Sequence, residues 1–133
     1  MSEDYKLPSN EHTFEISLFG DNTNQKFEGK FTYKRPTIGM QVDIQKTIGR
    51  MNGDLSTLPI QSVEDISNYN FILSTLKHCI VEAPKWFTNA NNGLDLYDSN
   101  VIKEVFEKCM SYDADYKKKV FSDSIKEVKV EQK

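Results

Sequence analysis

Two stretches near the start of the chain alternate apolar and polar residues, and this pattern restricts the fold more than any other feature. Every second residue is apolar from Phe14 within residues 12–19, and glycine or aromatic from Phe27 within residues 26–34. A period of two is typical of a strand with one buried face. The six residues between the stretches, GDNTNQ, all favour turns. We therefore predict an antiparallel β-hairpin over residues 12–34.

The rest of the chain shows helical periodicity. Apolar residues recur at spacings of three and four in the segments 37–52, 62–83 and 98–121. An isolated hairpin is only marginally stable in water, so its apolar face needs a partner, and these helices are the available one. A length of 133 residues is typical of one domain. The predicted fold is α+β, a hairpin packed on about three helices in a single domain over residues 12–121.

The two ends of the chain are polar or mixed in character. We expect residues 1–11 to form a flexible N-terminus. Residues 122–133 are rich in charges around a few apolar side chains. We expect this C-terminal tail to be frayed or to be ordered by a partner.

Composition excludes several functional classes. No apolar run approaches the roughly 18 residues that cross a bilayer, so we expect no membrane segment. The two cysteines, Cys79 and Cys109, show no disulfide or metal spacing, so we expect free thiols and a cytoplasmic location. Glycine-rich nucleotide fingerprints are absent, and His12 and His78 are the only histidines. We therefore predict no catalytic residues, no metal site and no cofactor, and we do not expect an enzyme.

A locally basic patch is the first candidate binding site. It consists of Lys26, Lys30, Lys34 and Arg35 in and just after the second predicted strand. Three of these cations share a strand face opposite the aromatic residues, whereas single-stranded nucleic acid is bound where bases stack beside cations. With a net charge of −3, the chain also lacks the basic balance typical of nucleic-acid-binding proteins. We favour a solvated strand face that protects the sheet edge.

Two large aromatic residues between the second and third predicted helices are the second candidate. Trp86 and Phe87 either plug the end of the helical layer or help form a groove for a partner, since tryptophan is enriched at interface hot spots. A similar choice concerns the apolar residues beyond the main core pattern, namely Val120, Phe121, Ile125 and Val128. They form either a satellite contact or part of a segment that orders on binding.

Three segments in order resemble the tail assembly chaperones of long-tailed phages. They are an extended run that enters an RPT turn and a helix (29–53), a helix that ends in APKWF (71–87), and a helix that opens with an acidic cap and VIKEV (98–121). The resemblance implies a host-cytoplasmic, non-enzymatic protein. It would bind the phage tape-measure protein and keep it soluble until the tail tube polymerises around it, with tail tube subunits as further partners. It leaves a homo-oligomer open.

No residue list comes with this resemblance. The candidate protein-binding residues are the bulky apolar groups near the loop and the distal third helix, namely Trp86, Phe87, Tyr112, Tyr116, Val120 and Phe121. Two alternatives remain at this point. The chain could be a structural virion protein of the tail, neck or connector, or a small nucleic-acid-binding regulator that uses the basic patch.

Overall fold

A three-stranded antiparallel sheet forms one layer of the molecule. The computed structural model describes residues 7–53 and 60–131. Strands β1 (Glu11–Phe19), β2 (Lys26–Lys34) and β3 (Ile80–Glu82) lie in the order β1-β2-β3. In the hairpin Phe14 lies opposite Phe31, and the apolar residues of both strands face the same side. The predicted hairpin is therefore confirmed.

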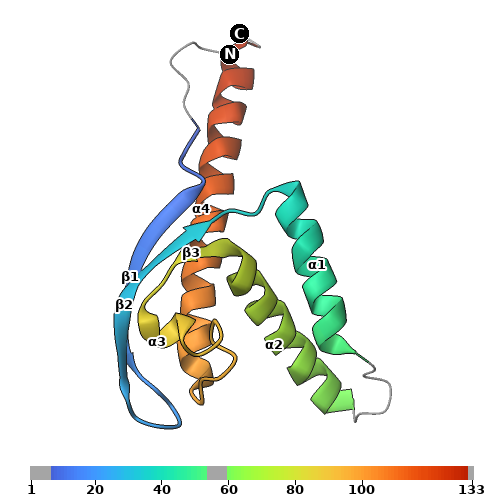
Figure 1. Cartoon of the computed structure of the whole chain (residues 1–133). Coiled ribbons are helices and arrows are strands. Elements are labelled where there is room, and N and C mark those ends of the chain that lie inside the picture. Colours follow the sequence, from blue (N-terminus) through green and yellow to red (C-terminus); the bar gives the residue numbers. More distant parts are fainter. Residues whose placement is uncertain (1–6, 54–59, 132–133) are drawn as a thin grey trace.

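The helices form the second layer. They are α1 (Ile38–Asn52), α2 (Ile60–Cys79), the short α3 (Lys85–Thr88) and α4 (Ser99–Glu131). Helix α4 runs along the sheet, and α1 and α2 form a pair on the same side of the sheet as α4 (Figure 1). The Thr37 hydroxyl accepts a hydrogen bond from the Met40 amide at the start of α1, and Gly53 ends the helix. The fold is α+β, as predicted.

The second helix is shorter at its end than the predicted 62–83. Helix α2 stops at Cys79, and the next three residues form β3 against β2, where Ile80 lies opposite Tyr33. Two physical effects explain this correction. Ile80 and Val81 are β-branched and favour strands, and Pro84 disfavours helical geometry in the residue before it. The segment that follows, predicted as loop, contains the one-turn helix α3.

The last helix is longer than the predicted 98–121. Helix α4 continues to Glu131, ten residues beyond the predicted end, and its distal part projects past the sheet (Figure 1). Residues 122–131 contain neither glycine nor proline and include several good helix formers, so nothing in the sequence stops the helix there. The predicted flexible N-terminus falls mostly on residues 1–6, outside the described residues, and β1 already begins at Glu11.

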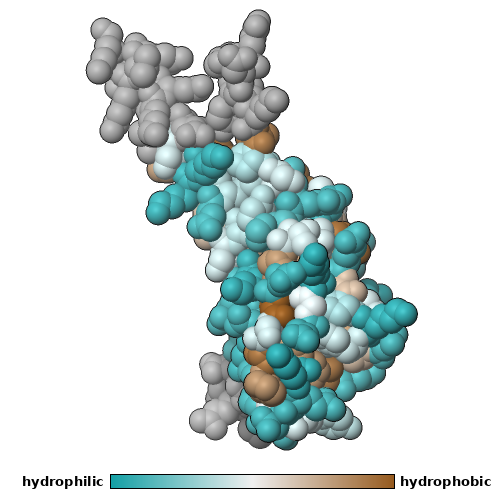
Figure 2. Space-filling view, turned by 90° about the vertical axis from the view of Figure 1, so that its left-hand side faces the viewer, coloured by the Kyte–Doolittle hydropathy of each residue, from teal (hydrophilic) through white to brown (hydrophobic). Residues whose placement is uncertain are grey.

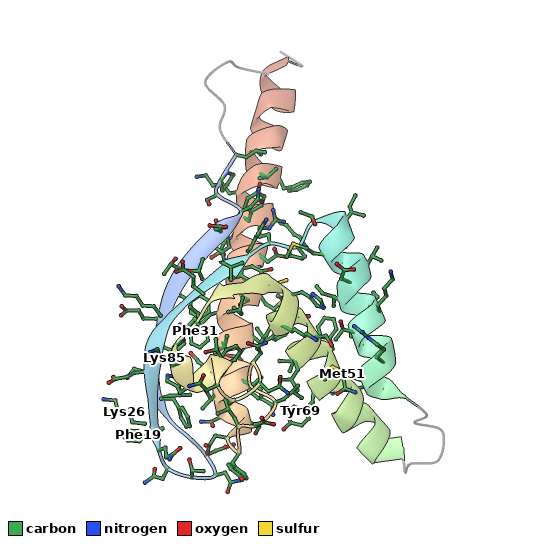
Figure 3. All side chains as sticks on the ribbon, in the orientation of Figure 1. Phe19, Lys26, Phe31, Met51, Tyr69 and Lys85 are labelled. Atoms are coloured by element: carbon green, nitrogen blue, oxygen red, sulfur yellow. The ribbon has the colours of Figure 1, made fainter. Side chains whose placement is uncertain are left out.

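The core lies between the hairpin and helices α2 and α4. Phe31, Phe87 and Val105 are almost completely buried there, and the Phe31 ring meets the Phe87 ring edge to face at a centroid distance of 5.2 Å. Phe31 points from β2 toward the helices, and Met51 lies between α1 and α2 (Figure 3). The hairpin is therefore stabilised by the helices.

A buried carboxylate fixes the hairpin turn to the start of α4. Asp98 Oδ1 accepts hydrogen bonds from the amides of Asn22 (2.6 Å) and Thr23 (2.7 Å), and Oδ2 accepts from the Thr23 hydroxyl (2.7 Å). Gly20 allows this approach, because a Cβ there would lie 2.2 Å from Asp98 Cγ. Burial raises the pKa of Asp98, but the hydrogen bonds from Thr23 and Asn22 outweigh burial and hold the pKa below its usual value.

Candidate functional site

The six predicted protein-binding residues do not form one surface. Phe87 is only 1% exposed and belongs to the core. Trp86 is partly buried against the same cluster, where its indole Nε1 donates to the Glu28 carbonyl at 3.0 Å and its ring packs edge to face on Phe27. These two aromatic residues thus plug the space between β2 and α4 instead of lining an open groove.

The other four predicted residues lie on α4. Tyr112 stacks on His12 at 4.3 Å and its hydroxyl donates to the Ser9 carbonyl, so it fastens the start of β1 to α4. Tyr116 is buried beneath the Arg35 guanidinium, which lies 3.6 Å from the ring centroid. Val120 is half-buried, whereas Phe121 is 66% exposed. Of the six, Phe121 is the one that is mostly free for a partner.

The predicted basic patch is largely neutralised by neighbouring carboxylates. Lys26 lies 3.6 Å from Glu28, Lys30 lies 3.8 Å from Glu15, and Arg35 lies 2.7 Å from Asp113. The face of the molecule on this side is mostly hydrophilic (Figure 2), and Lys26 lies on the outer side of the hairpin (Figure 3). These contacts favour a solvated strand face over a phosphate-binding surface.

An open hollow with apolar walls lies between α1, α2 and α4, and we call it, together with its continuation over α1, the inter-helix groove. The part between the helices has a volume of about 360 Å³. Apolar and aromatic side chains from four elements line it, namely Tyr33 from β2, Ile44 from α1, Phe71 from α2 and Met110 from α4. Phe71 is 46% exposed, although its ring also packs on Phe106. A partner side chain can therefore reach apolar surface here without unfolding the domain.

The inter-helix groove continues over the outer face of α1. A second, shallower hollow of about 480 Å³ shares Gln41 and Gln45 with the first and adds Ile38, Val42 and Lys46. Ile38 is 83% exposed and Val42 is 48% exposed. Because these two residues are four positions apart on a helix, they lie on the same side of α1. The two hollows together form one surface with an apolar base and amide and charged groups around it.

An ion-pair cluster forms one rim of the inter-helix groove. Asp113 on α4 binds the Arg35 guanidinium at 2.7 Å and the Lys117 ammonium at 3.3 Å. Burial lowers the pKa of Arg35, but the hydrogen bond and charge of Asp113 outweigh it, so the pKa of Arg35 is raised overall. The rim thus carries two fixed positive charges that share one carboxylate.

Both cysteines are buried as free thiols. Burial raises the pKa of the Cys79 thiol to about 11 and that of the Cys109 thiol to about 12, which keeps both protonated at neutral pH. Within residues 7–53 and 60–131, no three His, Cys, Asp or Glu side chains are close enough together to hold a metal ion.

Sequence reasoning missed the residues of the inter-helix groove, although one signal was present. Ile38 and Val42 fall outside the buried stripe of α1 that includes Ile44 and Ile48, and an apolar pair that is out of phase with the core stripe marks a second contact face. On α2, Phe71 likewise lies outside the buried stripe, which includes Leu73 and Leu76.

Comparisons with known proteins add no relative. The chain matches no protein-family model, no curated protein and no solved structure. Among the helices of the described part of the chain, none combines the length and apolar content needed to cross a lipid bilayer.

Proposed function

We propose that this chain is a binding protein that holds a helical segment of another polypeptide in the inter-helix groove. The observation that carries the proposal is an open groove with an apolar base, into which the side chains of Phe71 and Val42 are already exposed. Exposed apolar surface between helices suits the apolar face of an amphipathic helix, whose side chains at i, i+3 or i+4 and i+7 enter such a groove.

The resemblance of residues 29–121 to phage tail assembly chaperones suggests which polypeptide is bound. The client is then the tape-measure protein, and the chain keeps it soluble in the host cytoplasm until the tail tube polymerises around it. A helical rod with an apolar seam aggregates unless it is covered. The cover must later be displaced, so a chaperone of this kind needs moderate affinity.

The size of the inter-helix groove fits moderate affinity. Burying an apolar side chain of the leucine or phenylalanine type contributes about 1.5–3 kcal/mol, so two or three of them give about 3–9 kcal/mol before costs. Lost translational and rotational freedom on association takes up part of this gain. With an association cost of at least about 4 kcal/mol, at most about 5 kcal/mol remains, which corresponds to a Kd of about 0.2 mM or weaker.

A pull-down from phage-infected cells tests this function. We expect the tagged chain to recover the tape-measure protein, and Val42→Ser to weaken that recovery. Val81→Ser is the matched control, because Val81 has the same 48% exposure but does not line the groove. If both variants recover the client equally, the groove is not the binding surface.

Mass spectrometry of purified virions separates the proposed function from the structural alternative. An assembly chaperone leaves before the particle is complete, so the chain is expected to be absent from virions. Recovery of the chain in amounts comparable to those of tail subunits would instead identify it as a structural virion protein.

A further inference from the structure

We infer that the helix bound in the inter-helix groove is acidic along its flanks and comes from a different protein. This inference rests on the proposed function and specifies the chemistry of the partner. The inference is based on the charge around the groove, because the net charge of the lining residues is positive whereas that of the whole chain is negative.

The charged side chains that line the groove are three cations and one carboxylate. Arg35, Lys46 and Lys117 stand against Asp113, which gives a local net charge of +2 on a chain whose net charge is −3. A positive surface with an apolar base on an otherwise acidic protein favours a partner with complementary negative charge.

Two of these cations are accessible to a partner. The Lys117 side chain is 70% exposed, and it shares Asp113 with Arg35, so one carboxylate serves two cations. Lys46 is exposed on α1, and among the described residues no carboxylate pairs with it. Lys117 lines the part of the groove between the helices and Lys46 lines its continuation over α1, so a helix that covers both parts meets a positive charge in each.

A second copy of the chain fits this groove less well. The projecting end of α4 is an available helix, but residues 117–131 hold five lysines against three acidic residues. A groove facing a groove likewise brings like charges together. Like charges at an interface suppress association. The occupant is therefore a segment of another protein with glutamate or aspartate beside its apolar stripe.

A set of three synthetic helical peptides tests the inference. All three have the same apolar stripe over about 20 residues, a length of about 30 Å, and differ only in whether glutamate, glutamine or lysine occupies the flanking positions. Binding to the full chain is measured by fluorescence anisotropy at low and high salt. We expect the glutamate peptide to bind about tenfold more tightly than the lysine peptide at low salt. The difference should shrink as the ionic strength rises toward about 1 M.

Two charge-reversal variants test whether the preference for the glutamate peptide arises at the groove. The double variant Lys46→Glu with Lys117→Glu is expected to remove or reverse the preference for the glutamate peptide. The double variant Lys26→Glu with Lys30→Glu changes the net charge by the same amount on the outer face of β2, away from the groove, and should keep the preference. Equal effects of the two double variants would show that overall charge is responsible and would overturn the inference.

The outcomes separate this inference from the proposed function. If all three peptides bind equally and Val42→Ser weakens them, the groove binds helices but does not select acidic ones, so the inference is wrong and the function stands. If none binds, both fail. If the lysine peptide binds best, the partner is basic and the inference is wrong.

Discussion

At the scale of single residues, Asp98 shows how one carboxylate connects distant parts of the chain. It accepts three hydrogen bonds from the hairpin turn while it sits at the start of α4. Nearby, Asn100 reinforces the same junction, since its amide donates to the Phe19 carbonyl at 2.9 Å. The sequence predicted Asp98 only as a helix cap, because its partners lie about 75 residues away in the chain.

This junction predicts a specific pH dependence. The pKa of Asp98 is lowered in the folded protein, so its contribution to stability is complete about one pH unit above the unfolded value of about 3.9 and is lost progressively as the pH falls through that value. Thermal unfolding at a series of pH values measures this. We expect the wild type to lose stability from about pH 5 downwards, and Asp98→Asn to show a lower Tm at neutral pH and a flatter acid limb.

A control and a contrary result define this test. Asp95→Asn removes a carboxylate from the same loop without removing a described hydrogen bond, so its Tm should equal that of the wild type at neutral pH. If the Tm of the wild type falls no more steeply at acidic pH than that of Asp98→Asn, the role given to the Asp98 carboxylate is contradicted.

The two cysteines give a second prediction at this scale. Burial raises the pKa of Cys79 to about 11 and that of Cys109 to about 12, so very little thiolate exists at pH 8 in the folded protein. We expect a thiol reagent to modify both at least about 100-fold more slowly in the folded than in the denatured protein. Rapid modification of the folded protein would show that α2 and α4 separate readily at this point.

At the scale of helices and strands, local patterns predict much of the fold. The alternation around Phe14 and Phe27 predicts the hairpin, and Thr37 and Gly53 predict the limits of α1. The strand β3 could not be predicted in this way. Ile80 continues the apolar stripe of α2, so the helical period extends past Cys79. The β-branched Ile80 and Val81 and the nearby Pro84 favour a strand, and the free edge of β2 supplies its pairing partner. Tertiary context thus overrides the local pattern at the end of α2.

Replacing glycine by alanine is expected to change stability in opposite directions at two positions, Gly29 and Gly49. Gly29 lies in β2 against Pro84, and a Cβ there would be 2.3 Å from the proline Cγ. We expect Gly29→Ala to destabilise the protein by about 1–3 kcal/mol, because the proline ring is rigid. Gly49 lies in α1 with no atom within 4 Å of an added Cβ, so Gly49→Ala should stabilise by about 0.5–1 kcal/mol. Urea unfolding measures both, and equal effects would contradict the packing of β2 against Pro84.

At the scale of the whole molecule, the candidate site depends on the tertiary fold. Side chains from β2, α1, α2 and α4 converge on the inter-helix groove, and they span Tyr33 to Lys117 in the sequence. The sequence indicated that bulky apolar residues on α4 and before it could bind a partner, but the fold buries Phe87 and Tyr116 and covers most of Trp86. Which apolar residues remain exposed is decided by how the helices pack, and this cannot be read from the period of a single helix.

The central claim is that the inter-helix groove holds another polypeptide, and chemical-shift mapping by NMR tests it most directly. The isotope-labelled chain is titrated with the glutamate-flanked helical peptide while the backbone amide and side-chain methyl signals are followed. We predict the largest shifts at Ile38, Val42 and Met110, with the outer face of the hairpin unchanged. Shifts confined to the hairpin, or no shifts at peptide concentrations well above the micromolar range, would contradict the claim.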